Sequence, residues 1–212
     1  MSLATLRKEY GNKPLLESRA PIDPLVLFSR WLKVALATED VLEPTAMSLA
    51  TVDGRGRPSV RLVLLKGAGA EGFQFFTNFQ SRKARELDGQ RHAALALWWP
   101  PLERQVRIEG KVLRLSDAES DAYFASRPRG ARIGAWASPQ SRVIDSRTTL
   151  EARLASVAHR YEDRDVPRPP HWGGYRVVPR VIEFWQGRYS RLHDRLRYTR
   201  RAHAWVRERL AP

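Results

Sequence analysis

Two short apolar runs with a turn signal between them decide the fold of this chain: Ala46-Met47-Ser48-Leu49-Ala50-Thr51-Val52, then Asp53-Gly54, then Ser59-Val60-Arg61-Leu62-Val63-Leu64-Leu65-Lys66. Both runs are rich in Val and Leu, and runs of this length and composition are typical of β-strands. Three further runs of the same kind follow at residues 72–77, 93–99 and 105–115. Together they predict a succession of short strands through the first half of the chain.

Strand patterns return in the second half, at residues 175–178, 181–186 and 191–198, while the run that ends at Leu210 fits either a strand or a helix. Six or more short strands with few helices between them do not form the βαβ pattern of a parallel sheet. The order therefore predicts a mainly β, antiparallel barrel with flanking helices.

Helices are predicted where a capping side chain, which accepts a hydrogen bond from a first-turn N–H, precedes a helical pattern. The predicted caps are Asp23 followed by Pro24, Ser81, Ser116 in a capping box with Glu119, and Thr148 in a capping box with Glu151. The third of these helices should stop before Pro128, and the fourth should cover residues 148–162. The residues before Trp136 are interpreted as a Gly-containing loop, and Trp136 itself as core packing.

Length and composition indicate a single domain. The chain has 212 residues, of which 42% are hydrophobic, and this is enough for one sizeable core. Residues 1–20 are polar and weakly patterned, so we expect a mobile N-terminal segment followed by one domain over residues 21–212. The absence of cysteine excludes disulfides and thiol nucleophiles, and with only five scattered histidines we expect no metal site.

No apolar run approaches the roughly 20 residues that cross a bilayer, and the first residues lack the apolar core of a signal peptide. We therefore expect a cytoplasmic protein with no membrane contact. The net charge of +14 would suit nucleic acid, an acidic membrane surface or small polyanions. The 37 Lys and Arg residues are dispersed among 23 Asp and Glu residues, which argues against a dedicated nucleic-acid arm.

Near the C-terminus, Trp185, Arg191, His193 and Arg195 stand at odd-numbered positions. If the flanking runs are strands, all four side chains project to one side, because side chains alternate faces with period two. Such a surface would suit a planar, anionic ligand. The alternative interpretation is a solvated basic hairpin.

Two bases follow the predicted cap Ser81, namely Arg82 and Lys83. Cations in a first helical turn oppose the helix dipole, at about 0.3–1 kcal/mol each. An anion bound at that helix end would reverse the effect, so we predict a phosphate site there. Arg61 and Lys66 are an odd number apart, and in a regular strand they would face opposite sides and serve two different anions or none.

Tyr123 and Arg127 are four residues apart on one predicted helix face and could bind a second phosphate. A cation–π or packing pair is the alternative. Gln140 and Ser141 could cap a loop or donate to a ligand. The fingerprints of a dinucleotide-binding Rossmann site, a P-loop, a zincin and an α/β-hydrolase are all missing from the sequence.

In this order, the segments resemble the pyridoxine (pyridoxamine) 5′-phosphate oxidase family over nearly the whole chain. The motifs that carry the resemblance are Ser59-Val60-Arg61-Leu62-Val63-Leu64-Leu65-Lys66, Ser81-Arg82-Lys83, Arg104-Gln105-Val106-Arg107-Ile108-Glu109-Gly110, Tyr123-Phe124-Ala125-Ser126-Arg127-Pro128, Trp172-Gly173-Gly174-Tyr175-Arg176 and the run 191–195. The resemblance implies a homodimeric split β-barrel that binds FMN between its subunits. It also implies oxidation of pyridoxine or pyridoxamine 5′-phosphate to pyridoxal 5′-phosphate, with O2 as the electron acceptor and release of H2O2.

The resemblance further implies roles for individual residues. FMN contacts would fall on Arg61, Leu62, Val63, Leu64, Leu65, Lys66, Phe76, Thr77, Arg82, Lys83, Gln105, Gln140, Ser141, Trp185 and Arg195. Substrate contacts would fall on Arg7, Lys8, Glu9, Tyr10, Lys66, Tyr123, Arg127, Ala131, Arg191, Leu192 and His193, with the segment 7–10 as a lid. Arg191 and His193 would lie nearest the chemistry, Arg191 over the outer face of the substrate ring and His193 bonded to a ring substituent. The role of both is orientation, not that of an obligatory base, because hydride transfer to a flavin depends on orientation.

Three positions depart from the family pattern. Ala131 stands where serine is usual, Arg132 where glutamine is common, and Phe76 where tyrosine is usual. One hydroxyl contact to the substrate phosphate is therefore absent, or is replaced by Arg129 or Arg132. The alternatives to the family activity are a related FMN split-barrel oxidase of another pathway and, from a different class, a basic nucleic-acid-binding module.

Overall fold

The computed structural model describes residues 9–11, 13–202 and 204–212. The predicted substrate contacts Arg7 and Lys8 lie outside the described residues. The helices are α1 (Pro24–Leu36), α2 (Arg82–Gly89), α3 (Asp117–Ala125), α4 (Arg129–Ala137) and α5 (Arg147–Arg160). The strands are β1 (Ala46–Val52), β2 (Pro58–Leu64), β3 (Gly67–Gly69), β4 (Gly72–Asn78), β5 (His92–Trp99), β6 (Arg104–Arg114), β7 (Trp172–Gln186), β8 (Asp194–Arg201) and β9 (Ala204–Leu210). None of the helices among these residues has the length and apolar composition needed to cross a membrane.

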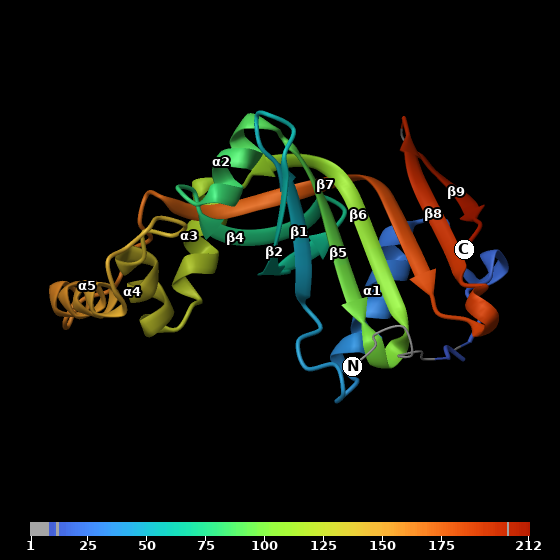
Figure 1. The fold of residues 1–212 in the computed structure, drawn as a ribbon, viewed down its shortest axis with the longest axis horizontal. Coiled ribbons are helices and arrows are strands. Elements are labelled where there is room, and N and C mark those ends of the chain that lie inside the picture. Colours follow the sequence, from blue (N-terminus) through green and yellow to red (C-terminus); the bar gives the residue numbers. More distant parts are fainter. Residues whose placement is uncertain (1–8, 12, 203) are drawn as a thin grey trace.

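The strands form one strongly twisted antiparallel sheet in the order β2-β1-β5-β6-β7-β4-β3 (Figure 1). The long strand β7 pairs with β6 along one edge, whereas β4 and then β8 pair with successive parts of its other edge. The helices α4 and α5 project from one end of the sheet, and β8 and β9 lie at the other end (Figure 1). The prediction of a mainly β, antiparallel fold with flanking helices is confirmed.

The two strands predicted at 175–178 and 181–186 are one continuous strand, β7, with Pro179 inside it. Proline has no N–H for a ladder hydrogen bond and is normally kept out of central strands. The structure accommodates Pro179 opposite Gly110, at the point where the β6–β7 register shifts between Glu109 and Gly110. A Cβ at Gly110 would lie 2.1 Å from the Val178 carbonyl oxygen, so only glycine permits this approach.

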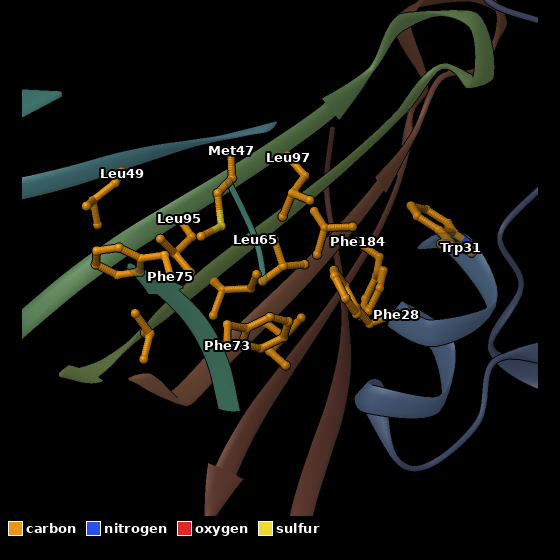
Figure 2. Close-up of a cluster of buried hydrophobic side chains, with 14 of the residues drawn as sticks. Phe28, Trp31, Met47, Leu49, Leu65, Phe73, Phe75, Leu95, Leu97 and Phe184 are labelled. Atoms are coloured by element: carbon orange, nitrogen blue, oxygen red, sulfur yellow. The ribbon is translucent and has the colours of Figure 1, made fainter. Parts of the chain in front are cut away.

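The core side chains of the strands gather in one cluster, and Phe28 and Trp31 of α1 pack at one side of it (Figure 2). Phe28 of α1 lies edge-on to Phe73 with 4.9 Å between the ring centroids, and Trp31 lies edge-on to Phe184 at 5.2 Å. All four rings are buried. Burial of each such side chain contributes about 1.5–3 kcal/mol, so these contacts attach α1 firmly to the barrel.

Most predicted helix starts are confirmed. Asp23 accepts a hydrogen bond from the Leu25 N–H, Ser81 caps α2, and Ser116 and Glu119 form a capping box. The capping box predicted at Thr148 and Glu151 is wrong, because Ser146 caps α5 through the Thr149 N–H.

The predicted loop before Trp136 is also wrong, because residues 129–137 form α4. Glycine at two positions lowers the intrinsic helix propensity of this segment. Its apolar side packs against α5 and the segment that follows α5, where Ile133, Tyr161 and Val166 form a small buried cluster. Tertiary packing therefore outweighs the propensity.

The strand predicted at 191–198 begins later, at Asp194, and the residues 189–191 before it form a short 3₁₀ turn. Arg191 and His193 are therefore not strand residues, and the period-two argument for their common face does not hold. The ambiguous run that ends at Leu210 is a strand, β9, paired with β8.

The segment 15–21 runs along β8 and β9. The guanidinium of Arg209 binds the Glu17 carboxylate through two nitrogens at 2.6 Å each and donates to the Leu15 carbonyl at 2.8 Å. The Tyr198 hydroxyl donates to the Pro21 carbonyl at 2.9 Å. These bonds hold residues 15–21 against the C-terminal strands β8 and β9.

Candidate functional site

A cavity of about 700 Å³ opens between the end of β2, the strand β4 and the helices α3 and α4. We call it the basic cavity. It is lined by Arg61, Leu62, Val63, Leu64, Lys66, Phe76, Thr77, Asn78, Lys83, Tyr123, Arg127, Ala131, Gly134, Ala135, Ser138, Gln140 and Trp172. Four of these side chains are cationic, and no acidic side chain of the described residues lines the cavity. The cavity is therefore suited to anions.

Arg61 and Lys66 both line the basic cavity, although a regular strand would turn them to opposite sides. The prediction of opposite faces is wrong because β2 ends at Leu64, so the alternation does not extend to Lys66. Arg61 donates to the Leu49 carbonyl and makes an ion pair with Glu86 at 3.2 Å. Leu65, predicted beside them, is instead buried in the core.

Lys83 has no acidic partner among the residues that the structure describes. The side chain is buried, and its Nζ lies 3.1 Å from Thr77 Oγ1 and 3.4 Å from both Ser81 Oγ and Gln140 Oε1. All three partners are neutral. Burial, and secondarily the charge of Arg61, lower the pKa of Lys83 to about 8. An anion in the cavity would restore the charge that burial disfavours.

Arg82, the other base in this turn, does not line the cavity. Its Nε donates to Glu86 Oε1 at 2.7 Å, one turn along α2. Glu86 also accepts hydrogen bonds from Ser59 and Thr51, and although burial opposes ionisation, these bonds and Arg82 lower the pKa of Glu86 to about 2. Glu86 is therefore a carboxylate that offsets the charges of Arg61 and Arg82 and leaves Lys83 unpaired.

Tyr123 of α3 and Arg127, which lies just past the end of that helix, line another part of the basic cavity. The Tyr123 ring stacks on Phe76 with 3.9 Å between centroids, and the Arg127 guanidinium lies 4.7 Å from the centroid of Trp172. Arg127 Nη1 is buried with no hydrogen-bond partner. A cation–π contact is thus present, but with Trp172, and it leaves donors of Arg127 available to an anion.

Ala131 also lines the cavity, and neither neighbouring arginine replaces the missing hydroxyl. Arg129 donates to the carbonyls of Arg164 and Tyr161. Arg132 binds the Asp165 carboxylate at 2.6 Å. Both side chains are held by the segment that follows α5, and neither lines the basic cavity.

The residues after α4 divide between the cavity and the surface. Gln140 Oε1 accepts hydrogen bonds from Thr77 and Lys83, so this side chain lines the cavity next to Lys83. Ser141 is exposed with φ at 69° and does not line the cavity.

A second group of predicted residues, Gln105, Trp185 and Arg195, lies on the convex face of the sheet. They are direct partners across β6, β7 and β8, and Trp98 of β5, which was not predicted, extends the row. The Trp185 ring centroid lies 5.7 Å from Trp98, and Arg195 Nε donates to Glu183 at 2.8 Å. We call this row, with His193 and Tyr10, the aromatic cluster.

His193 and Tyr10 complete the aromatic cluster beside Trp185. The ring centroids of Trp185 and His193 are 4.6 Å apart, and Tyr10 is edge-on to both rings. The Arg191 guanidinium lies 5.9 Å from the Tyr10 ring centroid. Glu9 and Leu192, also predicted to contact substrate, are exposed.

In one chain the predicted site is thus divided between the basic cavity and the aromatic cluster. None of Gln105, Trp185, Arg191, His193 and Arg195 lines the basic cavity. Sequence reasoning assigned no role in the site to Asn78, Gly134, Ala135, Ser138 and Trp172, which do line it. Three of them, Gly134, Ala135 and Ser138, lie on or beside α4. Because the sequence predicts a loop there, only their place in the chain next to Gln140 could have pointed to them.

An antiparallel sheet with a cation-lined cavity, and with a separate aromatic row on its convex face, is suited to binding flat, anionic molecules. Residues 35–161 match the family described as pyridoxamine 5′-phosphate oxidase. Residues 172–212 match the family described as the pyridoxine 5′-phosphate oxidase C-terminal dimerisation region. The chain therefore belongs to the pyridoxamine 5′-phosphate oxidase family, a family of oxidoreductases.

Individual relatives agree with this assignment. A pyridoxine/pyridoxamine 5′-phosphate oxidase from Burkholderia multivorans is 59% identical over 214 residues, covering 100% of this chain and 99% of the relative. A protein of the same name from Ectopseudomonas mendocina is 55% identical over 212 residues, with the same coverage. Among solved structures, PhzG from Burkholderia lata 383, in complex with tetrahydrophenazine-1-carboxylic acid, superposes with a TM-score of 0.87 at 34% identity, covering 93% of this chain and 98% of PhzG.

Proposed function

We propose that this chain is an FMN-dependent oxidase that converts pyridoxine or pyridoxamine 5′-phosphate to pyridoxal 5′-phosphate. O2 would be the electron acceptor, and H2O2 would be released. The observation that carries the proposal is the basic cavity, where a buried ammonium and a buried guanidinium nitrogen both lack a counter-charge. The names and the 55–59% identities of the relatives support the same activity.

The residues of the basic cavity fit FMN. A phosphate beside Lys83 would meet the unpaired ammonium together with Thr77 and Gln140, which surround it. The edge strand β2 borders the cavity with backbone groups of residues 61–64 that have no further strand beside them. Bound there, FMN would supply the redox chemistry, and the protein would supply binding and orientation.

The substrate would occupy the remaining part of the cavity. Its phosphate would lie between Lys66, Tyr123 and Arg127, all on the cavity wall. Its ring would need a covering group on the side away from the flavin. His193 of the aromatic cluster and the neighbouring Arg191 would supply this cover, with Tyr10 of the N-terminal segment closing over them.

A homodimer would unite the two halves of the site. On β2 the alternation is inverted, so that Val60 and Leu62 are 69% and 71% exposed while Arg61 turns inward. Trp98, on the same convex face, is 42% exposed. A second copy packed on this apolar face would cover it and could place its own aromatic cluster over the basic cavity. The dimerisation region that matches residues 172–212 contains Trp185, His193 and Arg195.

One rival activity has a specific observation in its favour. The similarity to PhzG at 34% identity suggests a related flavin oxidase that acts on another planar ring. The cavity lining argues for a phosphorylated substrate, because Lys66, Tyr123 and Arg127 remain when the flavin phosphate has been assigned to Lys83. The higher identities of the pyridoxine/pyridoxamine 5′-phosphate oxidases point the same way.

The purified protein is expected to be yellow, to release FMN on denaturation and to sediment as a dimer. It should oxidise pyridoxine 5′-phosphate with production of H2O2, and unphosphorylated pyridoxine far more slowly. A colourless protein that does not take up added FMN would refute the proposal. Equal turnover of both alcohols would assign the chain to the rival activity.

The affinity for FMN should depend on pH through Lys83. Its folded-state pKa of about 8 lies below the ordinary value of 10.5. As the pH rises through 8, Lys83 loses its proton in the apoprotein. FMN binding requires the protonated ammonium, so the affinity for FMN should fall by up to about tenfold per pH unit. The unfolded chain holds the proton up to higher pH, so apoprotein stability should change in the opposite direction and rise. FMN titrations at several pH values test this, and Lys83→Met should remove the dependence.

Ala131→Ser should improve binding of the phosphorylated substrate. The structure holds Arg129 and Arg132 elsewhere, so the missing hydroxyl is not replaced. One additional hydrogen bond to a phosphate should lower KM by up to about tenfold. Steady-state kinetics with pyridoxine 5′-phosphate measure the effect, with Ala135→Ser, also on the cavity wall, as the matched control. An unchanged KM would show that another group already fills this role.

A further inference from the structure

The turn between β7 and β8 has an unusual backbone. Ser190 and Arg191 are consecutive residues with positive φ, at 55° and 60°. Residues other than glycine rarely adopt this left-handed conformation, because the Cβ atom approaches the carbonyl oxygen. Two in succession need compensation from the surrounding structure, and such strain is concentrated at functional sites.

The turn folds the chain back so that the side chain of His193 meets the backbone of Arg188. The Arg188 N–H donates to His193 Nδ1 at 3.1 Å. A backbone amide can only donate, so Nδ1 must be the acceptor and cannot carry a proton. In the neutral imidazole the proton is then on Nε2.

The surroundings of His193 keep the ring neutral. Its ring contacts Trp185 and Tyr10, and the positive charge of Arg191 acts on it. Burial, followed by the charge of Arg191, lowers the pKa of His193 below its ordinary value of 6.5. The adjacent carboxylate, Asp194, accepts from the Leu15 N–H and from Arg209. Among the described residues, His193 Nε2 has no hydrogen-bond partner.

We propose that the turn 188–192 fixes His193 as the Nε2–H tautomer, so that this side chain presents a hydrogen-bond donor, and not a base, to the substrate. Its acceptor would be an oxygen substituent on a planar heteroaromatic ring. This second part rests on the function proposed above, whereas the tautomer itself follows from the Arg188 bond. Ser190 and Arg188 are then positioning residues that act through His193.

The tautomer can be observed directly by long-range 1H–15N NMR on histidine-labelled protein, with and without FMN. His193→Gln assigns the signal by its loss. The expected pattern is an unprotonated Nδ1 and a protonated Nε2 at pH 7.5. A protonated Nδ1, or an even mixture of tautomers, would overturn the proposal. This readout does not depend on turnover.

Two substitutions at Ser190 test the turn without touching the ring. Ser190→Gly is compatible with a φ of 55° and should keep the Nε2–H pattern. Ser190→Val cannot adopt this φ without strain. It should release the Arg188 bond, mix the tautomers and lower kcat/KM by about tenfold. An unchanged NMR pattern in folded Ser190→Val would show that the turn does not fix the tautomer. If Ser190→Val does not fold, the NMR spectrum of the wild-type protein still decides which tautomer His193 adopts.

A pair of amide substitutions tests the donor. The side-chain nitrogen of glutamine can reach the position of His Nε2, whereas that of asparagine reaches only the position of Nδ1. His193→Gln should therefore retain about tenfold more kcat/KM than His193→Asn, with FMN affinity unchanged in both. Equal losses would refute the donor role. A wild-type protein that binds no FMN would instead refute the proposed function and leave the tautomer to the NMR measurement.

Discussion

Replacing Lys83 with Ala is expected to weaken FMN binding by about 1.5–3 kcal/mol, or roughly ten- to hundredfold. The ammonium is buried among three neutral oxygens, so its charge is available to the flavin phosphate. Because the site is buried, the local dielectric is low, and an ion pair between Lys83 and the phosphate should be stronger than one on the surface. Titration of the apoprotein with FMN, followed by quenching of flavin fluorescence, measures the change.

Arg85→Ala is the matched control for this prediction. Arg85 is a base on the same helix, but it is exposed and donates to the Gln80 carbonyl. Its removal should leave FMN affinity unchanged, since it does not line the basic cavity. A Lys83→Ala protein with wild-type FMN affinity would remove Lys83 from the site. Lys83→Met fills more of the vacated space, and it should bind FMN as weakly as Lys83→Ala without loss of apoprotein stability.

Arg191→Ala is expected to lower kcat/KM by about a hundredfold while leaving FMN affinity nearly unchanged. The reason is that Arg191 would hold the substrate ring against the flavin, and small displacements of reacting groups cost about this much. Arg191→Lys should restore little, because an ammonium lacks the planar guanidinium that stacks on a ring. Steady-state kinetics with the flavin content of each variant measured separately test both statements.

The control for Arg191 is Arg200→Ala. Arg200 is an exposed arginine at the far end of β8, where its guanidinium lies 5.7 Å from the centroid of Trp205. Its removal should leave kcat/KM and FMN affinity as they are. Wild-type kcat/KM in Arg191→Ala would exclude Arg191 from the substrate site.

Several features were determined by the sequence alone because their causes are local. The strand 46–52 follows from its own composition, and the structure has the same bounds. The cap at Ser81 and the capping box of Ser116 and Glu119 depend on residues three apart. Tyr123 and Arg127 line one cavity, although α3 ends at Ala125 and Arg127 is therefore not on its face as predicted. In each case the hydrogen bonds or side chains that matter lie within a few residues.

Other features were decided only by the tertiary structure. The helix α4 contains residues of low helix propensity and depends on its packing against α5 and the loop beyond it. Arg61 and Lys66 meet in one cavity because β2 ends between them. Arg129 and Arg132 are drawn away from Ala131 by acceptors more than thirty residues distant.

The candidate site also combines features with local causes and features that only the tertiary structure decides. The row of Gln105, Trp185 and Arg195 exists because β6, β7 and β8 pair in one register, which no local pattern specifies. The period-two pattern suggested strand positions for Arg191 and His193, but the chain turns there, with two left-handed residues. Alternation of side chains holds only while a strand continues. Where a strand ends, and which strands become neighbours, depends on contacts between residues that are far apart in the sequence.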